Sequence, residues 1–187
     1  MTAAIRLDVT VPAIINPALP LLPTQTPRPA PGFPRTHRPS DVKMSRPTPL
    51  TRDDFPVFRS LQTRWSDNDL FGHMNNVVHY QLFDTAVNEW LIKLGLFDPH
   101  NSDIIGFVVE TKCNYFSELA FPDRVAAGIR IDHLGTSSVR YGIALFREDE
   151  EIAAAQGHFI HVYVDRETRK PKALPQNWRL ELEDYLA

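Results

Sequence analysis

The feature that most restricts the fold of this chain is one long helical pattern followed by several strand patterns. Between Val77 and Leu94, apolar residues recur every three or four positions, which predicts a helix with one buried face. Asn75 or Asn76 is a suitable N-cap for it, and Gly95 suits the position just past its end. No second long helix is predicted against which this apolar face could pack, so we expect a β-sheet to cover the face.

Strand patterns surround this helix in the sequence. One short run precedes it, and four follow: the first is rich in β-branched and aromatic residues, the next two alternate between apolar and polar residues, and the last is apolar on both faces, which suits a central strand. A short helix is expected near the C-terminus. The sequence therefore predicts an α+β fold in which an antiparallel meander wraps around the helix. The five runs span residues 58–64, 104–116, 123–132, 139–147 and 152–165, and the terminal helix lies within 174–186.

The first 50 residues differ from the rest in composition. They hold 11 of the 16 prolines and carry a net charge of +4, whereas residues 51–187 carry −7. Proline fixes φ and removes backbone donors, so we expect a disordered, basic leader over residues 1–50 and one domain over 51–187. Two alternatives for the leader stay open: a transit peptide, and a mis-assigned start that makes Met44 the true first residue. Residues 13–22 are too short and too rich in proline for a secretory signal.

Composition excludes several classes of function. An acidic domain without a stripe of Lys and Arg argues against nucleic-acid binding, and no run approaches the roughly 18 apolar residues of a membrane span. Cys113 is the single cysteine, which excludes an internal disulfide framework and a multi-Cys metal site. His158 and His161 alternate on a predicted strand and should face opposite sides, so no metal is expected. We expect a cytoplasmic protein, with organelle targeting by the leader as the alternative.

Chemically useful side chains are concentrated in the loop before the helix, which reads RWSDNDLFGHMNN over residues 64–76. The free N–H groups of a helix N-terminus can polarise a carbonyl oxygen, and a nearby carboxylate can deprotonate water or attack that carbonyl. Gly72 allows the backbone to approach a ligand closely. Asp and Asn are also common in ordinary turns, and we expect Asp67 to accept turn N–H groups. Residue types alone leave both interpretations open.

The longer stretch RWSDNDLFGHMNNVVHYQLFDTA resembles the signature of the hotdog-fold acyl-CoA thioesterases of the 4-hydroxybenzoyl-CoA thioesterase family. The resemblance extends weakly over residues 57–175, including the turn Gly135–Ser138, and does not include the leader. It implies an antiparallel sheet wrapped around one long central helix, hydrolysis of an acyl-CoA thioester, and no cofactor. It also implies a homodimer or homotetramer that forms by pairing of sheet edges, with active sites between subunits.

The resemblance assigns roles residue by residue. Asp69 matches the catalytic carboxylate, as base or nucleophile, and Asn76 matches the residue whose backbone N–H points at the thioester carbonyl. His73 matches a histidine of the related plant acyl-carrier-protein thioesterases. Those enzymes have an asparagine where this chain has Phe71, and this departure favours a mechanism centred on Asp69, with His73 in support.

Four further residues are predicted to bind substrate: Gly72, Asn75, Ser137 and Ser138. For the two serines a plain turn is the alternative, and we expect His79 to lie at an interface or in solvent. Two other functions stay open, a hotdog hydratase or dehydratase acting on acyl thioesters, and an acyl-CoA-binding protein without catalysis. The acyl group, and the choice between CoA and an acyl carrier protein, are not specified by the sequence.

Overall fold

The computed structural model of the protein describes residues 47–187, so residues 1–46 of the predicted leader lie outside it and their disorder stays a prediction. Five strands, two α-helices and two short 3-10 turns make up the described part. The strands are β1 (Val57–Gln62), β2 (Ile104–Tyr115), β3 (Arg124–Leu134), β4 (Ser138–Arg147) and β5 (Ala155–Asp165), the helices are α1 (Asn76–Lys93) and α2 (Gln176–Glu183), and the 3-10 turns are Arg52–Asp54 and Trp65–Asp67.

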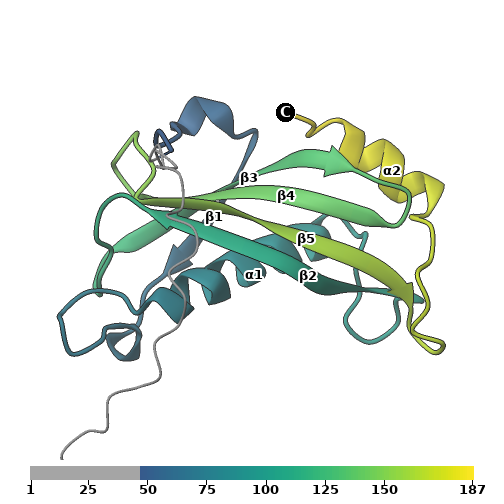
Figure 1. Cartoon of the computed structure of the whole chain (residues 1–187), viewed down its shortest axis with the longest axis horizontal. Helices are drawn as coiled ribbons and strands as arrows, with labels where there is room; N and C mark the ends of the chain where they lie inside the picture. The colour runs from purple at the N-terminus through teal and green to yellow at the C-terminus, as the bar shows by residue number, and fades with distance from the viewer. Residues whose placement is uncertain (1–46) are drawn as a thin grey trace, which may run out of the picture. The chain divides into compact units, whose positions relative to one another are not determined.

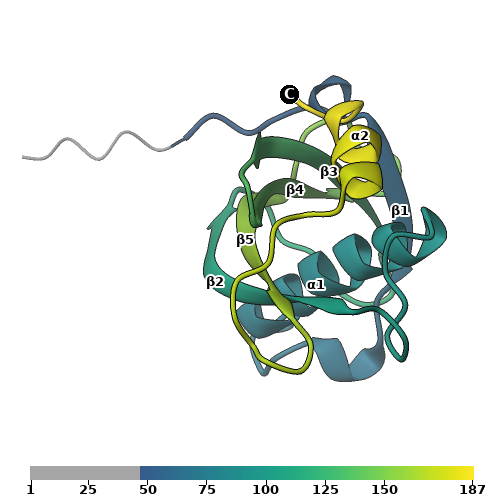
Figure 2. The same cartoon turned by 90° about the vertical axis from the view of Figure 1, so that its right-hand side faces the viewer.

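The strands form one antiparallel sheet in the order β1-β3-β4-β5-β2. This sheet curves around α1, which lies against its inner face (Figure 1 and Figure 2). The predicted α+β hotdog architecture is therefore confirmed. Strands β1 and β2, at opposite ends of the strand order, are the two edges, and each has one side without a strand partner among the described residues.

Helix α1 begins and ends within one residue of the predicted bounds. The side chain of Asn75 accepts the N–H of Val77 at 3.0 Å and caps the helix, while Gly95, at φ +70°, allows the chain to turn away after it. One apolar face of α1 is buried in the core against the sheet, and its most buried members are Phe83, Ala86, Val87, Trp90 and Leu91.

The segment before β1 covers part of the outer face of the sheet. Phe55 packs edge-on against Phe146. Its ring also occupies the space beside Gly128, because a Cβ atom added to Gly128 would lie 2.7 Å from the Phe55 ring. Leu50 donates its N–H to Oε1 of Gln156 at 2.7 Å, and the carbonyl oxygen of Thr48 accepts a hydrogen bond from the same amide. The last residues of the predicted leader are thus hydrogen-bonded to β5.

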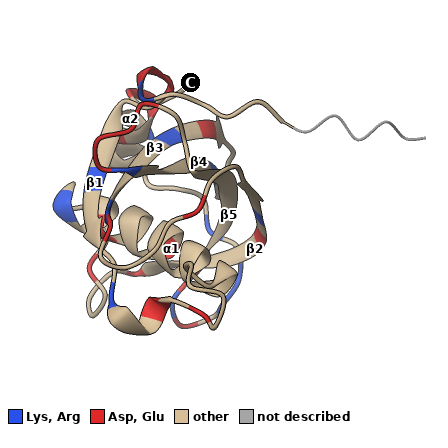
Figure 3. Cartoon of the chain, turned by 90° about the vertical axis from the view of Figure 1, so that its left-hand side faces the viewer, with Lys and Arg blue, Asp and Glu red and all other residues tan. Residues whose placement is uncertain are grey.

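The C-terminal segment packs against the end of the sheet farthest from the start of α1. Helix α2, whose existence the sequence predicted, places Trp178 against Tyr163, and Tyr185 lies edge-on to Trp90 at 4.9 Å. Strand β5 begins at Ala155, three residues after the predicted start. None of the helices in residues 47–187 is long and apolar enough to cross a membrane. Seen from the end that bears the loop before α1, acidic and basic residues are interspersed (Figure 3).

Candidate active site

The loop between β1 and α1 folds around Asp69. Its Oδ1 accepts the N–H of Phe71 at 2.8 Å, and its carbonyl oxygen accepts the N–H of Gly72 at 3.2 Å. The backbone N–H of Asp69 donates to the carbonyl oxygen of His73 at 3.0 Å. Gly72 closes this turn at φ +89°, a conformation that favours glycine. These contacts hold the Asp69 carboxylate in front of the first turn of α1.

The side chain of His73 lies beside the other oxygen of that carboxylate. Its Nδ1 lies 3.5 Å from Oδ2 of Asp69, and the imidazole stacks on the ring of Phe71. The side chains of Asp69 and His73 are 22% and 39% exposed, so both are reachable by water or a ligand. This placement allows the imidazole to orient the carboxylate or a water molecule bound to it.

The start of α1 presents one open hydrogen-bond donor. The N–H of Val77 is bound by the Asn75 side chain, and the N–H of Val78 donates to the Asn75 carbonyl oxygen at 2.9 Å. The N–H of Asn76 has no hydrogen-bond acceptor within residues 47–187. A free N–H at the positive end of a helix dipole is suited to bind a carbonyl oxygen or an oxyanion.

These three groups border one cleft, which we call the α1 cleft. Its volume is about 360 Å³, and it is lined by Asp69, His73 and Asn76 together with residues of three segments. The loop adds Phe71 and Met74, the first turn of α1 adds His79, and the end of β2 with the segment after it adds Tyr115, Ser117, Glu118 and Leu119. The structure therefore brings together all three residues predicted to be catalytic.

His79 is less exposed than one of its two expected placements requires. It was expected at an interface or in solvent. Solvent is excluded, because the residue is only 4% exposed within one chain, and the subunit interface stays a prediction. Its ring meets Tyr115 edge-on at 5.0 Å, and its Nδ1 lies 3.3 Å from the carbonyl oxygen of Asn75. Burial lowers the pKa of His79, so the imidazole is neutral at neutral pH. The helical spacing contained no sign that the end of β2 would cover this residue.

The residues predicted to bind substrate are not all in this cleft. Gly72 and Asn75 line a separate hollow of about 610 Å³ beside the exposed Trp65 and Leu70, and Asp69 borders both spaces. Ser137 and Ser138 lie in and just after the β3–β4 turn, at the other end of the sheet from the loop (Figure 1). Within one chain, the two serines are therefore remote from Asp69.

Asp67 has surroundings very different from those of Asp69. It is 2% exposed, and its carboxylate accepts the backbone N–H of Arg64 at 2.7 Å and the guanidinium of the same residue at 2.8–3.0 Å. It lines a hollow between β1 and α1, where the helix acids Asp84 and Glu89 also lie. Its oxygens are occupied within the turn, which leaves Asp69 as the acid available to the α1 cleft.

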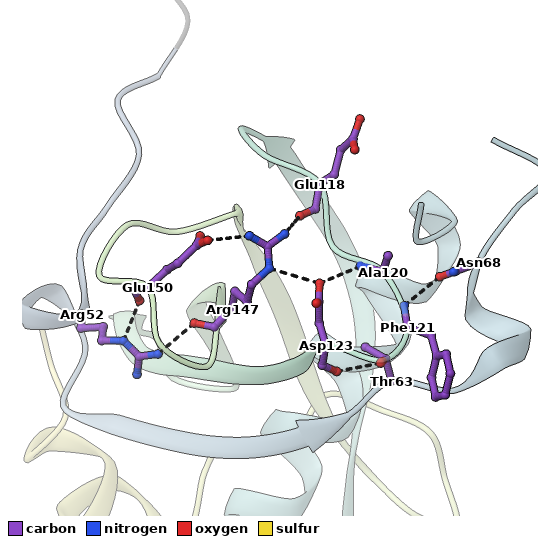
Figure 4. Close-up of polar contacts among 9 residues, drawn as sticks. All are labelled: Arg52, Thr63, Asn68, Glu118, Ala120, Phe121, Asp123, Arg147 and Glu150. Carbon is purple, nitrogen blue, oxygen red and sulfur yellow. Dashed lines mark hydrogen bonds and ion pairs between the residues drawn. The ribbon is translucent and has the colours of Figure 1, made fainter. Parts of the chain in front are cut away.

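A second network fixes the cleft wall formed by the end of β2 and the segment after it, and Figure 4 shows its polar contacts. The Arg147 guanidinium donates to the carbonyl oxygen of Glu118 at 2.6 Å, to the Asp123 carboxylate at 3.2 Å and to the Glu150 carboxylate. Asp123 in turn accepts the N–H of Ala120 at 3.0 Å. Arg147 therefore ties the cleft wall to the end of β4.

This wall is also joined directly to the loop that carries Asp69. The N–H of Met74 donates to the carbonyl oxygen of Leu119 at 2.6 Å. The N–H of Phe121 donates to Oδ1 of Asn68 at 3.0 Å, as Figure 4 shows. Loop and wall are thus positioned together, although they are far apart in the sequence.

Other candidate groups lie outside the cleft. Burial raises the pKa of Cys113 to about 11, so it is a thiol at neutral pH. His161 faces the core between Tyr141 and Tyr163, whereas His158 contacts Glu110 and Arg140 elsewhere, and the two do not converge. Within residues 47–187 no group of three or more His, Cys, Asp or Glu side chains is placed to hold a metal ion.

Known proteins are similar to this chain in both sequence and structure. A sequence profile of the thioesterase-like superfamily matches residues 63–182. The PA5185 protein of Pseudomonas aeruginosa strain PAO1 is similar in structure, with a TM-score of 0.72, 44% sequence identity and coverage of 74% of this chain and 97% of that one. A thioesterase from Thermus thermophilus, solved with coenzyme A and Zn, gives a TM-score of 0.60 at 25% identity, over 71% of this chain and 96% of that one.

One curated relative is also similar. The uncharacterized protein YsmA of Bacillus subtilis (strain 168) is 25% identical over 88 residues, which span 47% of this chain and only 59% of YsmA. Its similarity therefore supports common descent over part of the domain and carries no information on activity.

Proposed function

The chain belongs to the thioesterase-like superfamily, and from this premise we propose that it hydrolyses the thioester bond of an acyl-CoA. The observation that carries the proposal is that Asp69, His73 and the free N–H of Asn76 border one cleft at the positive end of α1. CoA as the thiol is supported by the similar protein from Thermus thermophilus, whose structure contains coenzyme A.

In the proposed reaction the thioester carbonyl oxygen accepts the N–H of Asn76. The Asp69 carboxylate either removes a proton from a water molecule that attacks the carbonyl carbon, or attacks that carbon itself to give a mixed anhydride that water then hydrolyses. In both routes the N–H of Asn76 and the dipole of α1 stabilise the oxyanion, the C–S bond breaks, and the CoA thiolate takes up a proton.

The neighbouring residues have supporting roles in this proposal. His73, 3.5 Å from the Asp69 carboxylate, orients that group or the attacking water. Gly72 closes the turn that presents Asp69, and Asn75 fixes the start of α1, so both would affect substrate binding through the position of Asp69 and Asn76 rather than by lining the α1 cleft.

We further propose that the active form is a homo-oligomer that pairs through β2. This edge strand has 12 residues, twice the length of the other edge β1, and it exposes Phe107, Val108 and Val109. A long apolar edge with unpaired backbone groups favours pairing with another strand. A second copy supplies a strand of the same length and the same apolar residues.

Antiparallel pairing of two β2 strands also gives the serines of the β3–β4 turn a role in the proposal. It would set the Ile104 end of one strand beside the Tyr115 end of the other. Ser138 pairs with Val162, which in turn pairs with Phe107, so the turn belongs to the Ile104 end of the sheet. Ser137 and Ser138 of the partner subunit would then approach the α1 cleft, where we propose that they contact the CoA arm.

Release of free thiol from a panel of acyl-CoAs and acyl-carrier-protein thioesters tests the proposed function. A thioesterase releases thiol in proportion to substrate consumed. A hydratase or dehydratase changes the acyl chain and releases none, and a binding protein retains the thioester unchanged. Absence of thiol release from every thioester, with binding or hydration detected instead, would overturn the proposal.

A further inference from the structure

The buried floor of the α1 cleft contains one polar side chain. Three of the residues that line the cleft are buried: Met74 at 3% exposed, Leu119 at 1% and His79 at 4%. The other lining residues are partly or fully exposed. A group that enters the cleft deeply enough to leave water therefore meets two apolar side chains and one imidazole.

The hydrogen-bonding role of that imidazole is set by its surroundings. The carbonyl oxygen of Asn75 can only accept, so Nδ1 of His79, 3.3 Å away, must carry the proton. Burial keeps the ring neutral, which leaves Nε2 with a lone pair and no proton. No described residue donates a hydrogen bond to Nε2, and unlike Nε2 of His161 it is not sealed inside the core. His79 thus presents an acceptor to the cleft.

The acyl group is the part of the substrate that would meet this acceptor. CoA is large and charged and needs solvent around it, and the rim residues of the cleft, such as Phe71 at 84% exposed, are open to solvent. His79 follows Asn76 by three residues, which corresponds to about 4.5 Å along the helix axis. An acyl group whose carbonyl binds the N–H of Asn76, and which extends along the first turn of α1, therefore passes His79 with its second to fourth carbon atoms.

From these observations, and resting on the proposed function, we infer that His79 is a specificity-determining residue that selects acyl groups bearing a hydroxyl or N–H donor close to the thioester carbon. Such a donor replaces the water that Nε2 loses when the substrate enters. A plain hydrocarbon chain removes that water and offers nothing in exchange, which leaves a buried acceptor unpaired.

Matched pairs of substrates test this inference. We would measure kcat/KM for butyryl-CoA against 2-hydroxybutyryl-CoA and 3-hydroxybutyryl-CoA. The unchanged protein should prefer the hydroxylated member of at least one pair by about tenfold. His79→Phe keeps an aromatic ring against Tyr115 but removes the acceptor, and it should reduce that preference to less than about twofold while improving turnover of butyryl-CoA. His79→Gln retains an acceptor at the end of its side chain and should restore part of the preference.

Two controls keep the result interpretable. His133→Phe changes an exposed histidine of β3 outside the cleft and should leave the preference unchanged, and thermal melting of each variant checks that it is folded. If no acyl-CoA is hydrolysed, the proposed function fails, and the same pairs are compared by calorimetric binding constants instead. The inference would be overturned if the unchanged protein gave equal kcat/KM values, or equal binding constants, for both members of every pair. A preference for the hydroxylated member that persists in His79→Phe would overturn it as well.

Discussion

Asp67 and Asp69 are two residues apart in the sequence but have opposite surroundings. Both oxygens of Asp67 are occupied by Arg64, and the residue is almost fully buried. Asp69 uses Oδ1 to hold the Phe71 N–H and leaves Oδ2 beside His73 in the α1 cleft. Substituting each aspartate separately therefore distinguishes a role in the reaction, expected for Asp69, from a role in holding the turn, expected for Asp67.

Asp69→Asn should lower kcat by at least roughly 100-fold, because the amide keeps the volume and the hydrogen bond to Phe71 but lacks the charge and basicity of the carboxylate. Its melting temperature should change little, since the side chain lies in a partly exposed loop. Thiol release and thermal melting measure the two effects.

Asp67→Asn is the matched control for that change. It should cost about 1–2 kcal/mol of unfolding free energy, through its weakened bonds to Arg64, and much less turnover than Asp69→Asn. His73→Ala should give an intermediate turnover. Near-normal turnover in Asp69→Asn, together with an inactive Asp67→Asn, would show that the wrong aspartate has been assigned.

His161 makes the stability of the fold depend on pH. Burial lowers the pKa of His161 to about 4, against 6.5 for an exposed imidazole. Between these values the unfolded chain takes up a proton that the folded chain does not, so the free energy of unfolding falls as the pH drops from about 6.5 to about 4. The contribution amounts to about 2 kcal/mol between pH 7 and pH 5.

Urea unfolding at pH 7 and pH 5 measures this contribution. His161→Leu removes the titrating ring, so the stability difference between the two pH values should shrink by about 2 kcal/mol relative to the unchanged protein. An equal pH dependence in both proteins would contradict a neutral, buried His161.

At the scale of elements, the segment between β2 and β3 forms one wall of the α1 cleft, and Arg147 holds it. Arg147→Met removes the donors to Glu118 and Asp123, so the wall should shift and weaken substrate binding. We expect KM to rise roughly three- to tenfold while kcat changes less than about twofold, because Asp69 and Asn76 lie on other segments. Steady-state kinetics separate the two parameters.

Two further variants distinguish positioning from general destabilisation. Arg147→Lys keeps the charge with fewer directed donors and should be intermediate. Arg124→Met removes an exposed arginine that lies 3.8 Å from Glu148 near the same turn, and it should leave KM unchanged. If Arg147→Met lowered kcat by the same factor by which it raised KM, a role of Arg147 limited to the wall of the α1 cleft would be contradicted.

The elements differ in how far the sequence could predict them. The bounds of α1 were predicted within one residue because its cap, its apolar spacing and its terminal glycine are all local signals. The role of Arg147 and the burial of His79 depend on contacts between segments distant in the chain, which no local pattern records. For the site, the sequence predicted the grouping of Asp69, His73 and Asn76 in front of α1, but not the wall that completes the cleft.

At the scale of the whole molecule, the boundary of the domain can be tested by shortening the chain. A protein that begins at Met44 keeps the hydrogen bonds of Thr48 and Leu50 to Gln156 and should retain its melting temperature and turnover. One that begins at Thr51 loses these bonds and the one from Ala153 to Leu50, which should cost about 1–2 kcal/mol of unfolding free energy. A large loss of stability in the first variant would show that the leader packs on the domain.

Activity should depend on assembly if β2 pairs with a second copy and the partner subunit completes the cleft. Dilution below the dissociation constant should then abolish thiol release in parallel with the loss of dimers in sedimentation. Val109→Lys, which places a charge on the exposed apolar edge of β2, should shift both transitions to higher protein concentration, whereas Phe58→Lys on the other edge strand should not. A monomer with full activity would contradict the shared site while leaving the proposed chemistry of Asp69 intact, because in that case one chain supplies every group that the reaction requires.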